Sequence, residues 1–151
     1  MTAAVTYPQV VLRGRRLRTD RACVMAIINR TPDSFFDHGA TFDPGRALAA
    51  VERAVLAGAD LVDIGGVKAG AGPAVSIAEE IDRVVPTIAA IRSAHPDLPI
   101  SVDTYRAEVA AVACDAGADL INDTWAGADP HLGEVAARYG AGIVCSHTGG
   151  P

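Results

Sequence analysis

The chain lacks the features of several protein classes. It has 151 residues and a net charge of −5 with no basic run, so we do not expect it to bind nucleic acid. No apolar run approaches the roughly 20 residues that cross a bilayer, and the first twenty residues hold no long apolar core, so we expect neither a membrane span nor a signal peptide. The three cysteines, Cys23, Cys114 and Cys145, are odd in number, lie far apart and form no C-x-x-C pair. We expect buried thiols in a reducing cytoplasm, rather than disulfides or a zinc site.

Arginine is concentrated near the start of the chain. The five residues of this cluster flank or follow Gly14, and they are Arg13, Arg15, Arg16, Arg18 and Arg21. We interpret them as the solvated side chains of a small hairpin.

Strand-like and helix-like segments alternate along the whole chain. Continuous apolar runs predict buried strands, and apolar residues at helical spacing predict helices. The expected strands are 10–12, 16–19, 23–28, 61–64, 100–103, 120–122 and 142–145, and the expected helices are 44–57, 77–94, 107–116 and 131–139. We expect Asp43, Ser76 and Asp129 to cap the first, second and fourth helices.

An internal repeat defines the fold class. Ala57-Gly58-Ala59-Asp60-Leu61 recurs 59 residues later as Ala116-Gly117-Ala118-Asp119-Leu120, at the point where a helix ends and a strand begins. Repeated βα units give a parallel sheet or barrel. A (β/α)8 barrel needs eight strands, so only about five of its βα units would lie in this sequence. A five-stranded open sheet is the alternative, and the length of the chain favours it.

Polar side chains follow each predicted parallel strand. Asn29, Asp103 and Asn122 stand where an apolar strand would otherwise continue, Asp63 lies within the second strand, and His147 follows the fifth. Because the carboxyl ends of parallel strands share one face, we expect these groups to line a single pocket. His147 taken alone is more typical of a structural or rim histidine.

Five segments together resemble one known family. They are VMAIINRTPDSFFDHG at 24–39, DLVDIGG at 60–66, ISVDTY at 100–105, DLIND at 119–123 and IVCSHTG at 143–149. Their order along the chain is similar to that of the dihydropteroate synthase signatures. The resemblance implies a (β/α)8 TIM barrel of the pterin-binding type, with residues 1–151 as an incomplete pterin-binding domain and residues 1–22 as a hairpin that caps the barrel.

The resemblance also implies a reaction. Family members condense p-aminobenzoate with 6-hydroxymethyl-7,8-dihydropterin pyrophosphate to give 7,8-dihydropteroate, a folate precursor, and they are usually homodimers. By resemblance, Asp103 and Asn122 would bind the pterin ring, and Asp63 and His147 would lie among the substrate-binding residues. Asn29 would lie at the pyrophosphate and its Mg²⁺. A closing loop would carry the catalytic residues Thr31, Asp33 and Phe35.

The sequence departs from the family at the second loop. Where most members continue Gly-Gly-Glu-Ser-Thr-Arg-Pro-Gly, this chain has Gly65-Gly66-Val67-Lys68-Ala69-Gly70-Ala71-Gly72. Lys68 would restore a positive charge without the planar fork of arginine, and Arg30 adds a cation that could bind an anion or block the pocket. We therefore expect a synthase-like transferase or an inactive homologue that binds a pterin or pairs with another subunit. A pterin-binding methyltransferase domain and a purely structural βα protein are further alternatives.

Overall fold

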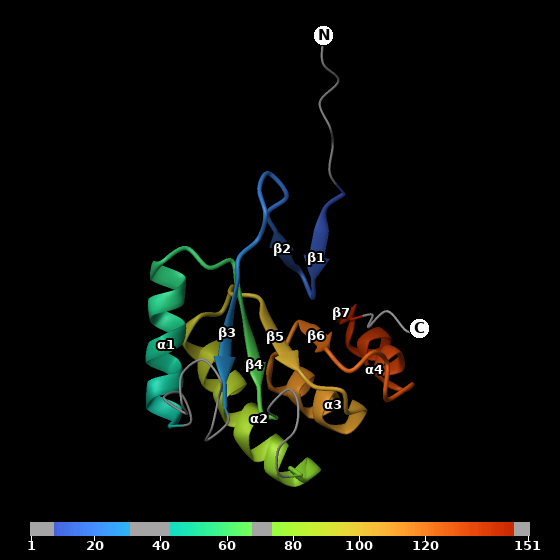
Figure 1. The fold of residues 1–151 in the computed structure, drawn as a ribbon. Coiled ribbons are helices and arrows are strands. Elements are labelled where there is room, and N and C mark those ends of the chain that lie inside the picture. Colours follow the sequence, from blue (N-terminus) through green and yellow to red (C-terminus); the bar gives the residue numbers. More distant parts are fainter. Residues whose placement is uncertain (1–7, 31–42, 68–73, 147–151) are drawn as a thin grey trace, which may run out of the picture.

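The computed structural model describes residues 8–30, 43–67 and 74–146. A two-stranded antiparallel hairpin, β1 (Val10–Leu12) and β2 (Arg15–Leu17), precedes a five-stranded parallel sheet with helices between its strands (Figure 1). The sheet strands are β3 (Met25–Asn29), β4 (Leu61–Gly65), β5 (Ile100–Asp103), β6 (Leu120–Asp123) and β7 (Gly142–Cys145). The helices are α1 (Pro44–Leu56), α2 (Ile77–Ala94), α3 (Ala107–Ala116) and α4 (Leu132–Tyr139). The predicted alternation of strands and helices is confirmed, and most element ends coincide with the expected ones, while the others differ by one or two residues.

The strand order identifies the sheet as part of a barrel. The strands lie in the order β3-β4-β5-β6-β7, so every strand pairs in parallel with the next one along the chain. An open doubly wound sheet reverses its strand order at a switch point, and this sheet does not. The chain is therefore part of a (β/α)8 TIM barrel, and the open-sheet alternative is wrong.

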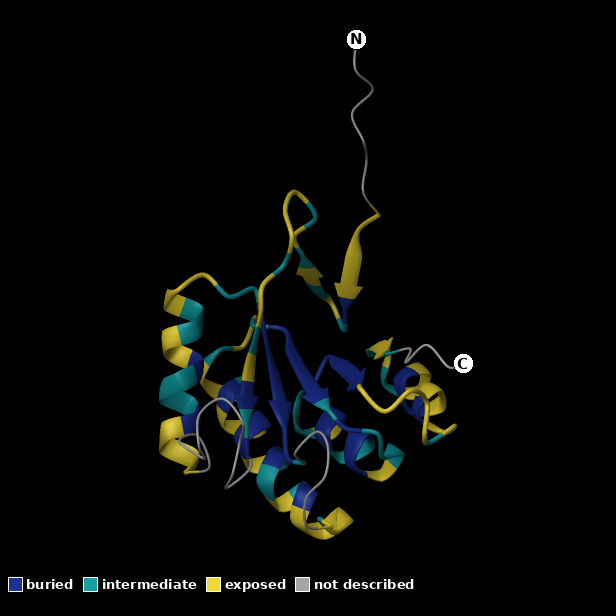
Figure 2. Ribbon diagram, in the orientation of Figure 1, coloured by how far each residue is buried: buried dark blue, intermediate teal, exposed yellow. Residues whose placement is uncertain are grey.

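The main core lies between the sheet and the helices. Alternate strand residues such as Ile64, Val102 and Ile121 pack against helix residues that include Val51 and Ile88, and these five side chains are fully buried. Figure 2 shows this burial in β4, β5 and β6, whereas β3 and β7 at the two edges are more exposed. The residues between these core positions point to the opposite, inner face of the sheet, which is the face that a barrel closes around.

The hairpin packs at the amino end of the parallel strands. Leu12 is buried in a small apolar cluster with Leu61 of β4 and Leu120 of β6. The contact is close, because a Cβ atom at Gly142 would lie 2.6 Å from Leu12 Cδ2. The hairpin therefore lies at the opposite end of the sheet from the polar strand ends (Figure 1).

The sequence led us to expect that the arginines of the hairpin are all solvated, and the structure shows that some are not. Arg13 Nη1 donates to the carbonyl oxygens of Cys114 (2.8 Å) and Ala118 (2.6 Å). Arg15 donates to the Pro96 carbonyl, and its Nη1 lies 2.7 Å from Asp119 Oδ1. The interpretation was wrong because carbonyl oxygens at the ends of the helices and in the helix-to-strand loops accept hydrogen bonds from these arginines at this end of the sheet.

The internal repeat places one aspartate in each of two such loops. Asp119 is fully buried and also accepts hydrogen bonds from Arg92 and from Ile100 N, the latter at 3.0 Å. Its counterpart Asp60 accepts from both terminal nitrogens of Arg21 and from Val24 N at 2.8 Å. Each repeat copy thus ties an arginine and a neighbouring backbone amide to the start of a strand.

Two predicted helix caps are confirmed and one is wrong. Asp43 accepts from Arg46 N at 3.0 Å, and Ser76 accepts from Glu79 N at 3.2 Å. Asp129 is not the cap of α4, since that helix begins after His131. Its carboxylate binds Ala107 N at the start of α3 (2.8 Å) and His131 N (2.9 Å), so it supplies α3 with a cap from a distant part of the chain.

Within the described residues, no helix combines the length and the apolar character needed to cross a membrane.

Candidate functional site

Polar residues form a row across the inner face at the carboxyl ends of the strands. In the strand register, Asn29 pairs with Gly65, Gly65 with Asp103, and Asp103 with Asn122. A Cβ atom at Gly65 would lie 3.7 Å from both Asn29 Oδ1 and Asp103 Oδ2. Glycine at this position therefore leaves room between two oxygen-bearing side chains, and the row brings together three of the residues predicted from the sequence.

Hydrogen bonds fix two members of the row from neighbouring positions. Thr124 Oγ1 donates to Asp103 Oδ1 at 3.1 Å, and Asn122 Nδ2 donates to Asp63 Oδ2 at 3.1 Å. Asp63 is 3% exposed and Asn122 is 8% exposed. The predicted placement of Asp63 beside Asp103 and Asn122 at one face thus agrees with the structure, while their binding roles stay predictions.

Burial raises the pKa of both carboxyl groups on this face, Asp63 and Asp103. The pKa of Asp63 is raised by burial, which outweighs the opposing effects of Ser101 and of the Asn122 hydrogen bond. The pKa of Asp103 is raised to about 6, first by burial and then by the negative charge of Asp63. Glu80 and Asp123 add smaller repulsion, and the Thr124 hydrogen bond acts in the opposite direction.

The raised pKa of Asp103 predicts a pH-dependent effect of Asp103→Asn. Because this pKa of about 6 exceeds the ordinary value near 4, folding holds a proton that the unfolded chain releases, and stability falls as pH rises between these values. The neutral amide of the variant removes the free-energy cost of ionising residue 103 in the folded chain. We expect it to be more stable than the parent at pH 8 by roughly 1–2 kcal/mol, allowing for partial exposure, and to show little difference near pH 4. Thermal melts at both pH values test this, and an equal shift at both would contradict it.

A third carboxylate, at the same ends of the strands, has a structural role. Asp123 is 1% exposed and accepts hydrogen bonds from Trp125 N (2.8 Å), Gly127 N (2.7 Å) and Cys145 Sγ (3.5 Å). It thereby folds the loop after β6, in which Ala126 has a φ of 57°. The Trp125 side chain, 38% exposed, lies against Tyr105 with ring centroids 4.9 Å apart. The sequence analysis did not single out these two aromatic residues, although both follow polar strand ends directly.

Arg30 is placed on the helix side of the strand end. Its side chain is 5% exposed, and its Nε donates to the Arg83 carbonyl of α2 at 3.3 Å. Burial lowers the pKa of its guanidinium. The structure therefore shows Arg30 in contact with α2, and its predicted role in substrate binding stays a prediction.

Two arginines hold the described ends of the connection between β4 and α2. Arg83 Nη1 donates to the Gly66 carbonyl at 2.7 Å. Arg106 donates to the Val75 carbonyl at 2.8 Å and pairs with the buried Glu80 at 2.7 Å. This connection carries the departure from the family pattern, and these contacts hold the backbone at its two described ends.

Several predicted site residues cannot be placed. Thr31, Asp33, Phe35, Lys68 and His147 lie outside the described residues. In the part of the chain that the structure describes, no group of three or more His, Cys, Asp or Glu side chains could hold a metal ion.

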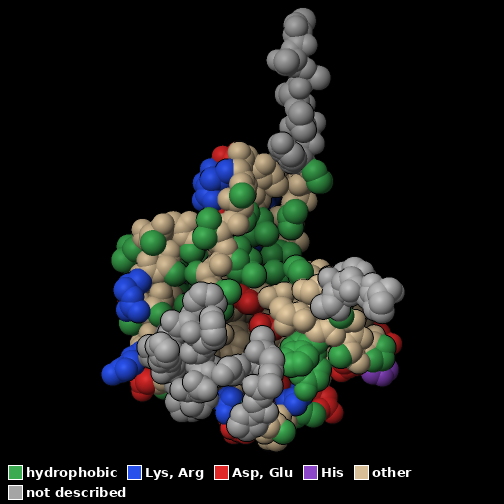
Figure 3. Space-filling view, viewed as in Figure 1, with side chains coloured by type: hydrophobic (Ala, Val, Ile, Leu, Met, Phe, Trp, Pro, Cys, Tyr) green, Lys and Arg blue, Asp and Glu red, His purple; other side chains and the backbone are tan. Residues whose placement is uncertain are grey.

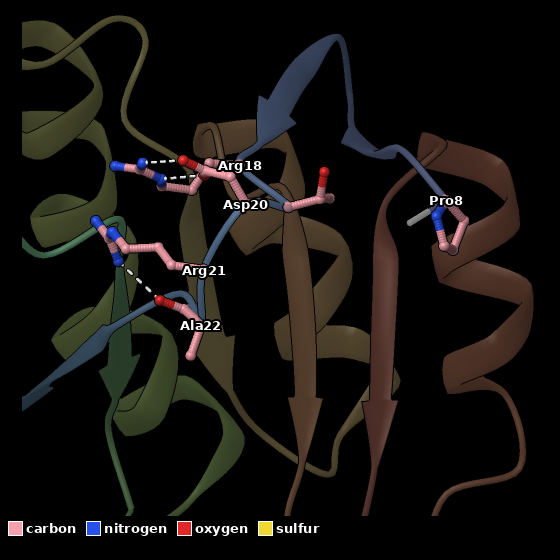
Figure 4. Close-up of a pocket in the computed structure, with 6 residues that line it drawn as sticks. Pro8, Arg18, Asp20, Arg21 and Ala22 are labelled. Atoms are coloured by element: carbon pink, nitrogen blue, oxygen red, sulfur yellow. Dashed lines mark hydrogen bonds and ion pairs between the residues drawn. The ribbon is translucent and has the colours of Figure 1, made fainter. Parts of the chain in front are cut away.

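Recesses elsewhere on the surface do not include the polar row. One of about 470 Å³ lies beside the hairpin, where Pro8, Arg18, Asp20, Arg21 and Ala22 line it and Arg18 pairs with Asp20 (Figure 4). Another, of about 580 Å³, lies among residues of α3, α4 and the start of α2. Figure 3 shows acidic side chains near the centre of the molecule, below hydrophobic side chains. The row remains the place where the sequence-predicted residues converge.

Comparison with known proteins identifies the family. Residues 25–151 match a family model described as pterin binding enzyme. A Mycobacterium leprae protein named inactive dihydropteroate synthase 2 is 63% identical over 142 residues, which are 94% of this chain and 49% of that protein. A dihydropteroate synthase of Streptococcus pyogenes is 44% identical over 136 residues, which are 89% of this chain and 51% of that protein.

A solved structure agrees with these relatives. The crystal structure of the Yersinia pestis dihydropteroate synthase with a sulfonamide drug complex matches with a TM-score of 0.86 at 40% identity, over 95% of this chain and 52% of that chain. The chain thus spans about half the length of the relatives it matches. Because the family model covers most of its residues, the chain belongs to the pterin-binding enzyme family, as a diverged relative of the dihydropteroate synthases.

Proposed function

We propose that this chain is a catalytically silent dihydropteroate synthase homologue that binds a reduced pterin. The observation that carries the proposal is the 63% identity to a relative named inactive dihydropteroate synthase 2, combined with the polar row. The alternative stated from the sequence is therefore preferred to synthase activity.

The polar row supports pterin binding. Asp103 and Asn122 stand side by side on rigid strand ends, where a carboxylate and an amide can pair with the donors and acceptors of a flat heterocycle. Asn29 at the other end of the row offers an amide oxygen, which suits a hard cation but fills only one of its coordination positions. Mg²⁺ commonly takes one or two protein oxygens and fills its shell with water and phosphate oxygens. A pyrophosphate-bearing ligand would therefore have to bring most of the magnesium ligands, and the cation would supply charge neutralisation to that group.

The second loop supports the loss of catalysis. Val67, Ala69 and Gly70 stand where most family members have glutamate, threonine and arginine, so a carboxylate, a hydroxyl and a guanidinium group are missing. Transfer between two substrates needs both to be held in one geometry, and small apolar residues cannot provide those contacts. Binding of the pterin depends on the strand ends and is separable from this loop.

An active synthase is the second candidate, favoured by the 44% identity to the Streptococcus pyogenes enzyme. In that case p-aminobenzoate would be the second substrate and Thr31, Asp33 and Phe35 would close over the reacting carbon. A homodimer and a cytoplasmic location extend the proposal on the basis of the family resemblance and the three free cysteines. Of these, only Cys114 is buried as expected, whereas Cys23 is half-buried and Cys145 is exposed.

The experiment is a titration of 6-hydroxymethyl-7,8-dihydropterin pyrophosphate and Mg²⁺ into the full chain, followed by addition of p-aminobenzoate and chromatographic detection of dihydropteroate. The chain has a single tryptophan, so Trp125 fluorescence reports binding beside the row without interference from other tryptophans. We expect saturable binding and no product. Product would establish the second candidate, and the absence of binding would refute both.

A further inference from the structure

A second polar layer lies beneath the row on the inner face. Asp63 and Ser101 pair in the strand register, one inward-facing position closer to the amino end than Gly65 and Asp103. Asp63 is 3% exposed and Ser101 is fully buried. Asp63 reaches the row itself, since its Oδ2 accepts the hydrogen bond from Asn122 Nδ2 at 3.1 Å.

This hydrogen bond determines which end of the Asn122 amide faces the ligand. Asn122 Nδ2 is the donor and Asp63 Oδ2 the acceptor of this bond, so the amide turns its NH₂ group toward Asp63, as an ionised carboxylate requires. Its carbonyl oxygen is then directed away from Asp63. The opposite orientation would set the Asn122 oxygen against a carboxylate oxygen in a buried place, where such repulsion is costly.

Asp63 gains little from the surrounding fold. Its Oδ1 is buried and accepts no hydrogen bond of good geometry, and Ser101 Oγ beside it makes none, although the nearness of this hydroxyl lowers the pKa of Asp63. A buried carboxylate with an unpartnered oxygen lowers stability, so structural support does not explain the residue. Holding Asn122 in one orientation does explain it.

We propose that Asp63 is a positioning residue that fixes the Asn122 amide, so that Asn122 Oδ1 and the Asp103 carboxylate present adjacent acceptors that select a reduced pterin over an oxidised one. The inference rests on the proposed pterin binding. A 7,8-dihydropterin carries an N–H donor at ring position 8, whereas the oxidised ring has an acceptor there. Two oxygen acceptors on the protein pair well with a ring edge that carries hydrogen-bond donors. Against the oxidised ring, one of these oxygens would face the acceptor at position 8 and would have no donor to pair with.

The test measures the affinities for the reduced and the oxidised pterin in the parent chain and in one variant. At pH 8, where Asp103 is ionised, we expect the full chain to bind 7,8-dihydropterin about tenfold or more tightly than the oxidised pterin. Asp63→Asn keeps the size of the side chain but can offer either an oxygen or an NH₂ group to Asn122. We expect this variant to reduce the ratio of the two affinities to about threefold or less, chiefly because it binds the reduced ring more weakly.

The matched control is Ser101→Ala, which removes the neighbouring buried hydroxyl and leaves the Asp63–Asn122 hydrogen bond in place. We expect it to keep the ratio of the parent chain. If Asp63 had only a structural role, Asp63→Asn would weaken the binding of both ligands equally. An unchanged ratio of affinities in this variant would therefore overturn the inference.

A measurement without ligand separates this inference from the proposed function. In the ¹H–¹⁵N spectrum of the free chain, the Asn122 side-chain amide should show one proton protected from exchange by Asp63, and Asp63→Asn should remove that protection. If the free chain shows no such protection, the inference fails whatever binds. If protection is present and the chain binds neither ring, pterin selection fails together with the proposed function, while the orientation of Asn122 stands.

Discussion

Asp119→Ala is expected to bring the chain close to unfolding. The carboxylate is fully buried and joins three parts of the molecule: Arg15 of the hairpin, Arg92 of α2 and the backbone amide of Ile100. Removing it leaves two partly buried guanidinium groups without their carboxylate and the buried amide of Ile100 without its side-chain acceptor. Breaking a buried charge pair in this way costs about 3–5 kcal/mol, a large share of the roughly 5–15 kcal/mol that stabilises a domain. Urea denaturation monitored by circular dichroism measures the loss.

The internal repeat provides a matched control for this prediction. Asp60 occupies the equivalent position and also binds an arginine and a backbone amide, but the Arg21 side chain is 40% exposed. We expect Asp60→Ala to cost only about 1 kcal/mol, because solvent screens an exposed pair. Similar losses in the two variants would mean that burial of the Asp119 network does not determine its contribution.

Replacing both Asp103 and Asn122 by alanine is expected to remove pterin binding. The two residues are adjacent in register and carry the oxygen atoms that face the inner side of the sheet. Each lost hydrogen bond to a charged or buried partner is worth about 1.5–3 kcal/mol, so the double variant should bind at least roughly 100-fold more weakly. Calorimetric titration of a 7,8-dihydropterin measures the change.

The control variant is Thr124→Ala, which removes the hydrogen bond to Asp103 Oδ1 but leaves both binding groups. We expect a loss of affinity of less than about tenfold. Because Asn122→Ala also leaves Asp63 Oδ2 without its donor, the double variant must first be shown to fold by its circular dichroism spectrum. A folded double variant that retains affinity would contradict the assigned roles.

The arrangement of elements could be predicted from the sequence because local signals agree along this chain. Continuous apolar runs placed β4, β5 and β6, and Asp43 and Ser76 mark the starts of α1 and α2. The polar residues that interrupt these runs also predicted the row of Asn29, Asp103 and Asn122. A parallel sheet places such strand ends together by topology alone, so no detailed geometry was needed.

Partners far apart in the sequence could not be predicted in the same way. Asp119 binds Arg15 across 104 residues, and Asp129 caps α3 although it lies just before α4. The repeat revealed that residues 60 and 119 are equivalent, but not that their carboxylates receive arginines. The direction of the Arg30 side chain toward α2 depends on packing at the strand end, which spacing along the chain does not encode.

The most direct test of the account is to map pterin binding residue by residue. In a ¹H–¹⁵N titration of the full chain with a 7,8-dihydropterin, we predict the largest shifts at Gly65, Asp103, Asn122 and Thr124, at the carboxyl ends of β4, β5 and β6. Shifts confined to the 580 Å³ recess of α3 and α4, for example at Arg138 and His131, would place the ligand elsewhere. That result, or the absence of any shift at saturating ligand, would contradict a pterin site at the polar row.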